Sequence, residues 1–436
     1  MDCNCYPLLT KFEPCRKKLA EWRKQEYTPV LRLFFWSTLM FRFITETFER
    51  LLEELPSTHT RYLYPEFQLR NRLTGLIGAR GVGKTTLLLQ YIKNKLHGEK
   101  AFYFSADSIY FQSSNLLQFV NDLYQLEGYR IIFIDEIHKY HGWDQELKNI
   151  YDSFPSLKIV FSGSSMLDLV TGSYDLSRRA KLYQLFGMSF REFLNFSYNL
   201  DLGVLSFQDL LQGSLKKSTP HILTYFDEYL QRGYYPFVFE DPHSYHEKVS
   251  RIIDKTIFED IANYYALKTP TLQYFKRILT YLASIPPSEI NINNLSKYLS
   301  IDNKSAEHYL HILTAVGLIR EMRPYEGGGP GLRKQVKFLL NNTTLMHTMQ
   351  QYVGDPISKG TERELFFVQS LQNAGISLFY SKQGDYQTSE MIFEVGGKNK
   401  TRRQLKNATL PAYLVKDDML QPFKEEIPLY QCGLLY

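Results

Sequence analysis

The sequence of 436 residues has few cysteines. It holds 4 of them, and Cys3, Cys5 and Cys15 lie close to the amino terminus. So few cysteines cannot form a disulfide scaffold in a chain of this length. No Cys-x-x-Cys pair and no nearby histidine complete a tetrahedral zinc site. The sequence therefore predicts free thiols in a reducing compartment.

Long apolar runs are also missing. The most apolar early stretch, residues 33–41, lies between Arg32 and Arg42 and is far shorter than the roughly 20 residues of a spanning helix. It lies too far into the chain for a signal peptide, and no small-residue cleavage site follows it. We expect a cytoplasmic protein that does not bind a membrane.

Neither sign of charge dominates, and there are no internal repeats or low-complexity tracts. With 51 Lys and Arg against 46 Asp and Glu, the net charge of +5 permits a nucleic-acid surface without requiring one. Tyr (32) and Phe (30) are abundant enough to build large cores. At about 150 residues per domain, the length predicts two to four domains.

Residues 1–39 show no clear periodicity. From Phe41 onward apolar residues recur at three- and four-residue steps, which predicts that a helix begins there. Because Met40 directly precedes this point, we interpret residues 1–39 as an extension that is dispensable for folding.

Short apolar runs then alternate with helical patterns up to about residue 193. This alternation predicts an α/β fold with a largely parallel sheet covered on both faces. The expected strands are 73–77, 101–105, 130–134, 158–162 and 181–186, and the expected helices are 84–96, 116–126 and 145–152.

A glycine-rich turn joins the first of these strands to the first helix, and it fits G-x-x-x-x-G-K-[ST]. Backbone N–H groups of such a turn point at phosphate oxygens, and the helix N-terminus adds positive charge. Lys84 is expected to bridge the β- and γ-phosphates of ATP, and Thr85 to ligate Mg²⁺. The predicted nucleotide-binding residues are Gly78, Ala79, Arg80, Gly81, Val82, Gly83, Lys84, Thr85 and Thr86.

Two acidic residues follow the buried strand 130–134. Asp135 is expected to hold Mg²⁺, and Glu136 to polarise the attacking water, because ligands of open α/β sheets bind at the carboxyl ends of the strands. Polar residues at the end of strand 158–162 are candidates for sensing the γ-phosphate, namely Ser162 and Ser164, although a turn or helix cap explains them equally well.

Two arginines on an expected loop, Arg178 and Arg179, are candidates for neutralising phosphate charge in the transition state. Surface arginines are common, so a purely solvated role is the alternative.

The motifs together resemble a large bacterial and archaeal family of AAA-type ATPases. They are Gly-Ala-Arg-Gly-Val-Gly-Lys-Thr, Ile-Asp-Glu-Ile-His-Lys, Phe-Ser-Gly-Ser-Ser-Met-Leu-Asp-Leu, Leu-Ser-Arg-Arg and Met-Ser-Phe-Arg-Glu-Phe, in that order. The likeness covers residues 41–436 and includes a Gly-Tyr-Pro turn at 233–236. It implies an additional-strand P-loop NTPase core that prefers ATP, with Glu136 catalytic, followed by a winged helix and a restriction-endonuclease-like domain.

The order of elements after Pro270 is itself that of a winged helix: three helices (275–283, 293–299 and 304–316) and a two-stranded hairpin (318–322 and 335–340). Basic residues on the last helix and the hairpin are candidates for DNA phosphate contacts. They are Lys304, Arg320, Arg323, Arg333, Lys334 and Lys337. Because the last helix carries one lysine opposed by Glu307, packing against protein remains the alternative.

In the final segment, the resemblance implies a metal site at Asp385 and Glu394, with Glu364 as a further carboxylate. Its Glu-x-Lys pattern is broken, because Gly396 stands two positions after Glu394. Lys398 is the expected substitute, and a nuclease fold without activity is the alternative.

We therefore expect an ATPase that couples Mg·ATP turnover to its C-terminal modules and acts on DNA. The alternatives are a nucleotide-dependent switch that binds DNA or protein, and an ATP-regulated nuclease. Partners include ATP, DNA, and either further copies of the chain or another protein. The expected domains are an extension (1–39), the ATPase core (40–196), a helical lid or linker (197–270), the winged helix (271–345) and the nuclease-like domain (346–436).

Overall fold

The computed structural model describes residues 29–56, 59–112, 114–163, 178–213, 219–286, 291–325, 336–354 and 356–436. The chain forms two compact units, Met1–Glu54 and Leu55–Tyr436. Further domain boundaries within the second unit stay predictions.

The described part of the first unit is one helix, α2 (Pro29–Glu53). Arg50 in the last turn complements the helix dipole. The prediction that this helix begins near Phe41 was wrong, because α2 begins earlier and runs through the proposed boundary at residue 39.

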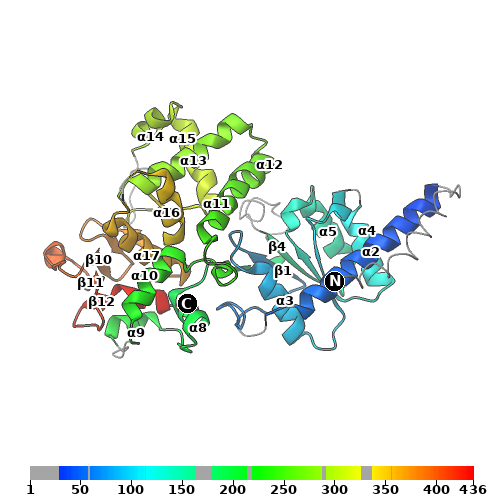
Figure 1. The fold of residues 1–436 in the computed structure, drawn as a ribbon, viewed down its shortest axis with the longest axis horizontal. Coiled ribbons are helices and arrows are strands. Elements are labelled where there is room, and N and C mark those ends of the chain that lie inside the picture. Colours follow the sequence, from blue (N-terminus) through cyan, green and yellow to red (C-terminus); the bar gives the residue numbers. More distant parts are fainter. Residues whose placement is uncertain are drawn as a thin grey trace, which may run out of the picture. The chain divides into compact units, whose positions relative to one another are not determined.

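The second unit begins with the expected α/β core. Its five strands are parallel and lie in the order β2-β3-β4-β1-β5. The helices α4 and α5 pack against each other, and α3 lies on the opposite side of the strands (Figure 1). The elements are β1 (Leu73–Ile77), α3 (Lys84–Lys95), β2 (Ala101–Ser105), α4 (Leu116–Gln125), β3 (Ile131–Asp135), α5 (Trp143–Ser153), β4 (Lys158–Gly163) and β5 (Ala180–Gln184). These positions confirm the predicted alternation within two residues at each end.

The central strands are buried because they carry apolar side chains on both faces. All five residues of β1 and of β3 are buried, as is most of β4. Since the strands are parallel, the segments that follow β1, β3 and β4 meet at one edge of the sheet. The glycine-rich turn, Asp135, Glu136 and Ser162 all lie at or just beyond the carboxyl ends of these strands.

A helical region follows the core, as expected. Its first helix, α8 (Phe190–Tyr198), begins with a capping box in which Ser189 and Glu192 each satisfy the other's backbone N–H. The remaining helices are α9 (Phe207–Gln212), α10 (Ile222–Arg232), α11 (Tyr245–Lys255) and α12 (Ala262–Tyr265). A π-helical segment, Thr256–Ile261, joins α11 to α12 and is called the π-turn below.

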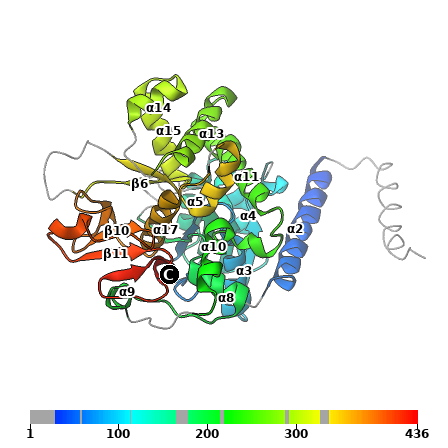
Figure 2. The same cartoon turned by 60° about the vertical axis from the view of Figure 1, so that its left-hand side comes forward.

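Three helices and an antiparallel hairpin come next, in the predicted order. Figure 2 shows the helices grouped together beyond the hairpin strand β6. They are α13 (Thr269–Ser284), α14 (Ile292–Leu299), α15 (Asn303–Ala315), β6 (Ile319–Met322) and β7 (Lys337–Leu340). Beyond β6, Tyr325 N donates to the Tyr380 carbonyl and Tyr380 N donates to the Arg323 carbonyl. The hairpin is therefore tied to the following sheet through its backbone.

The last part of the chain is a mixed sheet in the order β12-β11-β10-β9-β8, with β10, β11 and β12 parallel. Helix α17 packs on β10 (Figure 2). The elements are α16 (Thr343–Met349), α17 (Lys359–Asn373), β8 (Phe379–Tyr380), β9 (Tyr386–Gln387), β10 (Ile392–Gly396), β11 (Ala412–Lys416) and β12 (Glu426–Pro428). A buried 3-10 segment, Leu429–Leu434, returns to α8, where Arg191 Nε donates to the Tyr436 carbonyl.

Within the described residues, no helix is both long enough and apolar enough to cross a bilayer.

Candidate active site

The glycine-rich turn between β1 and α3 contains two glycines in the left-handed conformation, Gly81 and Gly83. Gly83 has φ 93°, a left-handed conformation that side chains disfavour, and it directly precedes α3. Lys84 is buried, with 4% of its surface exposed, and its Nζ donates to the carbonyls of Gly78 (3.0 Å) and Ala79 (3.1 Å). Burial lowers the pKa of Lys84, while the negative charges of Glu136 and Asp135 oppose that shift.

The Asp135 carboxylate, at the end of β3, lies at the centre of a hydrogen-bond network. Its Oδ2 accepts from Thr85 Oγ1 (2.5 Å) and from the Tyr103 hydroxyl (2.8 Å). Its Oδ1 accepts from Glu136 N (3.1 Å) and from Ser162 Oγ. The structure thus brings together the two residues predicted to hold Mg²⁺. Sequence reasoning missed Tyr103, because nothing in its apolar surroundings on β2 marks its hydroxyl as part of the site.

Glu136 follows directly and is oriented by an unusual backbone conformation, with φ 51° and ψ 41°. Its Oε2 is buried and makes no hydrogen bond within the described part of the chain, and it lies 3.5 Å from His138 Nε2. Burial raises the pKa of Glu136, with Lys84 opposing and Asp135 adding to the shift. Burial lowers the pKa of His138 to about 3, so this histidine is neutral near pH 7.

These residues fit Mg·ATP. Thr85 and Asp135 supply oxygen ligands of the kind that Mg²⁺ prefers, and the turn supplies backbone donors and the Lys84 charge for phosphates. The unsatisfied Oε2 of Glu136 is a free acceptor beside them. A buried polar atom without a partner is costly unless a ligand or water supplies one.

The other predicted catalytic residues lie elsewhere or act indirectly. Ser162 is fully buried and holds Asp135, so its contact with a γ-phosphate stays a prediction. Ser164 lies outside the described residues. Arg178 and Arg179 precede β5, whose first residue is in register with Leu73 at the start of β1. They therefore lie at the edge of the sheet opposite the glycine-rich turn.

The position of Arg179 is set by α5, since its guanidinium pairs with Asp152 at 3.5 Å and lies over Tyr151. The structure does not bring either arginine to the phosphate site of its own chain. A catalytic role for them would require a second copy of the chain.

A buried ion pair between Arg61 and Glu192 contacts the glycine-rich turn, and sequence reasoning missed it. Arg61 donates through Nε to Glu192 Oε1 (3.0 Å) and through Nη2 to Oε2 (3.2 Å). Its Nη1 donates to the Val82 carbonyl within the turn, and its Nη2 also reaches the Phe186 carbonyl (2.8 Å). Glu192 therefore joins the start of α8 to the glycine-rich turn.

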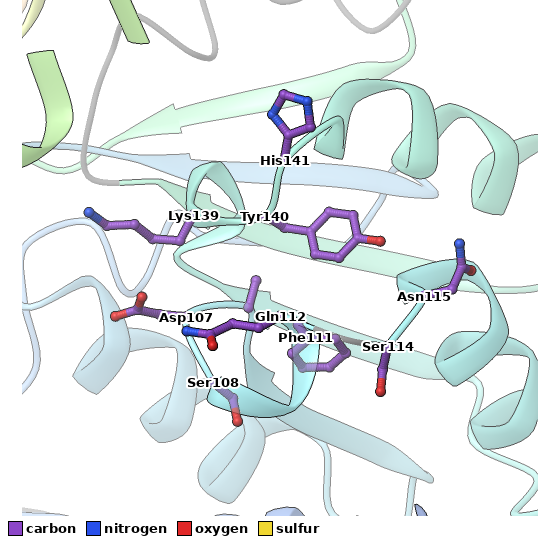
Figure 3. A pocket seen from close by; sticks show the side chains of 10 residues that line it. Asp107, Ser108, Phe111, Gln112, Ser114, Asn115, Lys139, Tyr140 and His141 are labelled. Carbon is purple, nitrogen blue, oxygen red and sulfur yellow. The ribbon is translucent and has the colours of Figure 1, made fainter. Parts of the chain in front are cut away.

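Beside the site, a cavity of about 500 Å³ lies between the turn after β2 and the turn after β3. Lys139 and His141 line one side, and Asp107 and Ser108 line the other (Figure 3). Because β1, β2 and β3 belong to one parallel sheet, both turns lie at the same edge of that sheet as the glycine-rich turn.

A second polar cluster lies in the C-terminal sheet, where the resemblance implied a metal site. Glu394 on β10 is fully buried, and its Oε1 lies 2.5 Å from Lys400 Nζ. Asp385 Oδ2 accepts from Val395 N (2.8 Å), and Glu364 Oε2 accepts from the Tyr386 hydroxyl (2.9 Å). Burial and the charge of Asp385 raise the pKa of Glu364 to about 7.

The expectation that Lys398 serves this cluster was wrong. Lys398 is exposed, and Lys400 makes the contact instead. Gly396 makes this possible, because a Cβ there would come within 2.5 Å of the Lys400 side chain. Among the residues that the structure describes, no three His, Cys, Asp or Glu side chains are arranged to hold a metal ion. Metal binding at Asp385 and Glu394 therefore stays a prediction.

One of the predicted DNA contacts is also corrected. Arg320 is buried, with 8% exposure, and donates to the Asn341 carbonyl (2.5 Å) and to Asn373 Oδ1 (2.8 Å). It joins the hairpin to α17 and cannot reach a phosphate backbone. Arg323 is exposed and pairs with Glu321, while Arg333 and Lys334 lie outside the described residues.

Comparisons with known proteins agree with the α/β fold of the core. Residues 70–194 match a family described as an AAA domain, and residues 223–355 match a domain of unknown function. With the parallel sheet, these findings support an AAA-type P-loop ATPase domain that binds and hydrolyses nucleotide. An uncharacterized protein of Methanocaldococcus jannaschii is 28% identical over 373 residues, which is 78% of either chain.

Solved structures resemble the chain more weakly. AMPPCP-bound DnaA from Aquifex aeolicus is 17% identical, with 62% of this chain and 86% of that chain covered and a TM-score of 0.24. PCH-2 of C. elegans is 16% identical, with 43% and 56% covered and a TM-score of 0.28.

Proposed function

We propose that this protein binds Mg·ATP at the glycine-rich turn and hydrolyses it, using Glu136 as the general base. The observation that carries the proposal is the arrangement around Asp135. Thr85 donates to its carboxylate, Lys84 lies buried at the start of α3, and Glu136 presents a side-chain oxygen without a hydrogen-bond partner in the described part of the chain.

Each residue has a defined task in this reaction. Thr85 and Asp135 would hold Mg²⁺, which would neutralise phosphate charge when bound. Lys84 donates to phosphate oxygens in place of the Gly78 and Ala79 carbonyls. Glu136 Oε2 accepts a proton from the attacking water, and its raised pKa makes it a stronger base than an ordinary carboxylate. A positively charged His138 would lower the pKa of Glu136 and make it a weaker base. Because His138 is neutral near pH 7, it has no such effect.

The C-terminal modules are the proposed targets of this turnover. The three helices and hairpin would form a winged helix that binds DNA, with Lys304 on α15 as the basic residue of its recognition helix. Two observations favour the alternative of a winged helix used for packing: Arg320 is buried, and the hairpin pairs with Tyr380.

A second candidate function, an ATP-regulated nuclease, is favoured by the cluster of Asp385, Glu394, Glu364 and Lys400, if the C-terminal sheet is the restriction-endonuclease-like domain that we propose. Lys400 brings a positive charge to Glu394 although the usual position is occupied by Gly396. A lysine beside carboxylates supports developing charge during phosphodiester hydrolysis.

The test measures ATP hydrolysis with and without Mg²⁺, in the presence of double-stranded or single-stranded DNA, and follows the DNA on the same gel. Turnover that DNA stimulates while the DNA stays intact supports an ATPase acting on nucleic acid. Cleavage that Asp385→Ala abolishes supports the nuclease. Tight ATP binding with negligible turnover, unchanged in Glu136→Gln, would replace hydrolysis with a nucleotide-dependent switch.

A multi-copy assembly is also part of the proposal, because Arg178 and Arg179 cannot reach their own site. Either arginine would complete the site of a neighbouring copy. Mixing Glu136→Gln protein with Arg178→Ala/Arg179→Ala protein tests this: restored turnover in the mixture supports shared sites, and strictly additive rates contradict them.

A further inference from the structure

An aspartate from the helical region reaches the glycine-rich turn. Asp260 lies on the π-turn, and its side chain is only 3% exposed. Its Oδ1 accepts from Lys139 Nζ at 2.8 Å and from Arg80 Nη2 at 3.2 Å. Arg80 belongs to the turn, and Lys139 follows Glu136. One carboxylate therefore joins the two segments that would surround a triphosphate.

Helix α11, which directly precedes the π-turn, also lies on the glycine-rich turn. Around Gly81, the nearest side-chain atoms to a Cβ would belong to Ile252 on α11 (2.9 Å) and to Phe237 (3.0 Å). π-Helical segments are rare and are frequently found at functional sites. Here the π-turn directs Asp260 into the site while α11 packs on the turn.

The charges in this region conflict with a bound triphosphate. Asp260 interacts electrostatically with Lys84 and with Glu136, so its negative charge acts on the phosphate site itself. Phosphate oxygens are negative too, and their natural partners are the cations that Asp260 holds. Arg80 Nε makes no hydrogen bond within the described residues, so Arg80 has donor capacity left for another oxygen.

We propose that Asp260 is a built-in competitor of the γ-phosphate. When ATP binds, Arg80 and Lys139 exchange the Asp260 carboxylate for γ-phosphate oxygens, and the π-turn and α11 loosen from the glycine-rich turn. ADP lacks the γ-phosphate and leaves the Asp260 contacts in place. Since α11, the π-turn and α12 lead directly into α13, this exchange would transmit the nucleotide state to the C-terminal helices. The inference rests on the proposed ATP binding.

The experiment compares the affinities of fluorescent ATP and ADP analogues, with Mg²⁺, for the full chain and for Asp260→Asn. Removing the competing charge should tighten ATP binding about tenfold, because a unit charge a few ångströms away acts strongly in a partly buried site. ADP binding should change by no more than about twofold. The matched control is Glu259→Gln: this carboxylate also pairs with Lys139, at 3.6 Å, but is 48% exposed, so both affinities should stay within about twofold.

Hydrogen exchange of the unmodified protein provides a second test that needs no variant. Peptides from residues 245–265 should exchange faster with a non-hydrolysable ATP analogue than with ADP. Equal exchange in the two states overturns the proposal, as does Asp260→Asn that binds ATP no tighter than the unmodified chain. If the unmodified chain binds neither nucleotide, the proposed function fails as well. If it binds both without these differences, only the role of Asp260 fails.

Discussion

The buried ion pair behind the glycine-rich turn gives a prediction with a definite size. Arg61→Ala removes the guanidinium from Glu192, which is only 1% exposed. Glu192 then keeps two backbone donors, Tyr62 N at 2.5 Å and Ser189 N at 3.1 Å. Removing one partner of a buried pair costs about 3–5 kcal/mol, and the remaining donors place this case near the lower end of that range. The carbonyls of Val82 and Phe186 lose their donor too.

Unfolding in urea, followed by the fluorescence of Trp143, measures this cost. Trp143 is buried on α5, and Trp22→Phe with Trp36→Phe would make it the reporter of the α/β core. With a urea dependence of about 2 kcal/mol per molar, a loss of about 3 kcal/mol lowers the midpoint by about 1.5 M. The same variant should also weaken ATP binding, because Val82 belongs to the turn.

The matched control is Arg251→Ala. Arg251 pairs with Glu247 on the surface of α11, where both side chains are more than 70% exposed. An exposed pair of this kind contributes no more than about 0.5 kcal/mol. Equal midpoints for Arg61→Ala and Arg251→Ala would refute the reasoning, since burial would then make no difference.

Three further predictions concern the two sites. Lys84→Ala should abolish nucleotide binding. Glu136→Gln should still bind nucleotide but should slow ATP turnover by about 10²–10⁴-fold. Equal turnover rates for Glu136→Gln and the unmodified chain would remove Glu136 from the mechanism. The pKa of Glu364 is raised from 4.5 to about 7, which means that the folded state binds this proton more tightly than the unfolded state does. The free energy of unfolding should therefore fall as pH rises from 4.5 to 7. Urea denaturation of Glu364→Gln should lack this decline. Lys400→Met leaves the buried Glu394 carboxylate without its cation, so urea midpoints should show a larger loss of stability at pH 8 than at pH 5. Lys398 is exposed, so Lys398→Met should leave the urea midpoint unchanged at either pH.

The α/β core and the glycine-rich turn were predictable because their signals are local. A run such as Ile131–Ile134 is apolar on both faces, which only a buried strand accommodates, and the spacing from Gly78 to Thr85 encodes the turn itself. The position at which a strand ends is also determined locally, by the change from apolar to polar residues. For these reasons Lys84, Thr85 and Asp135 lie at the positions that the sequence predicted, at the start of α3 and the end of β3.

Contacts between distant segments were not predictable in this way. Arg61 and Glu192 are 131 residues apart, and Arg80 and Asp260 are 180 apart. A single charged residue carries no periodic signal, so nothing in the sequence indicates which opposite charge it will meet. Arg320 and Lys398 were misjudged for the same reason, because burial of a long basic side chain depends on what folds against it.

The sequence by itself therefore determined the parallel sheet, the glycine-rich turn and the acidic pair at the end of β3, because backbone hydrogen bonding and apolar patterning act over a few residues. Only the tertiary structure decided that Arg61 supports the turn, that Lys400 rather than Lys398 faces Glu394, and that Asp260 holds Arg80. Each of these depends on how remote elements pack, since a charge is buried only where another segment supplies its partner.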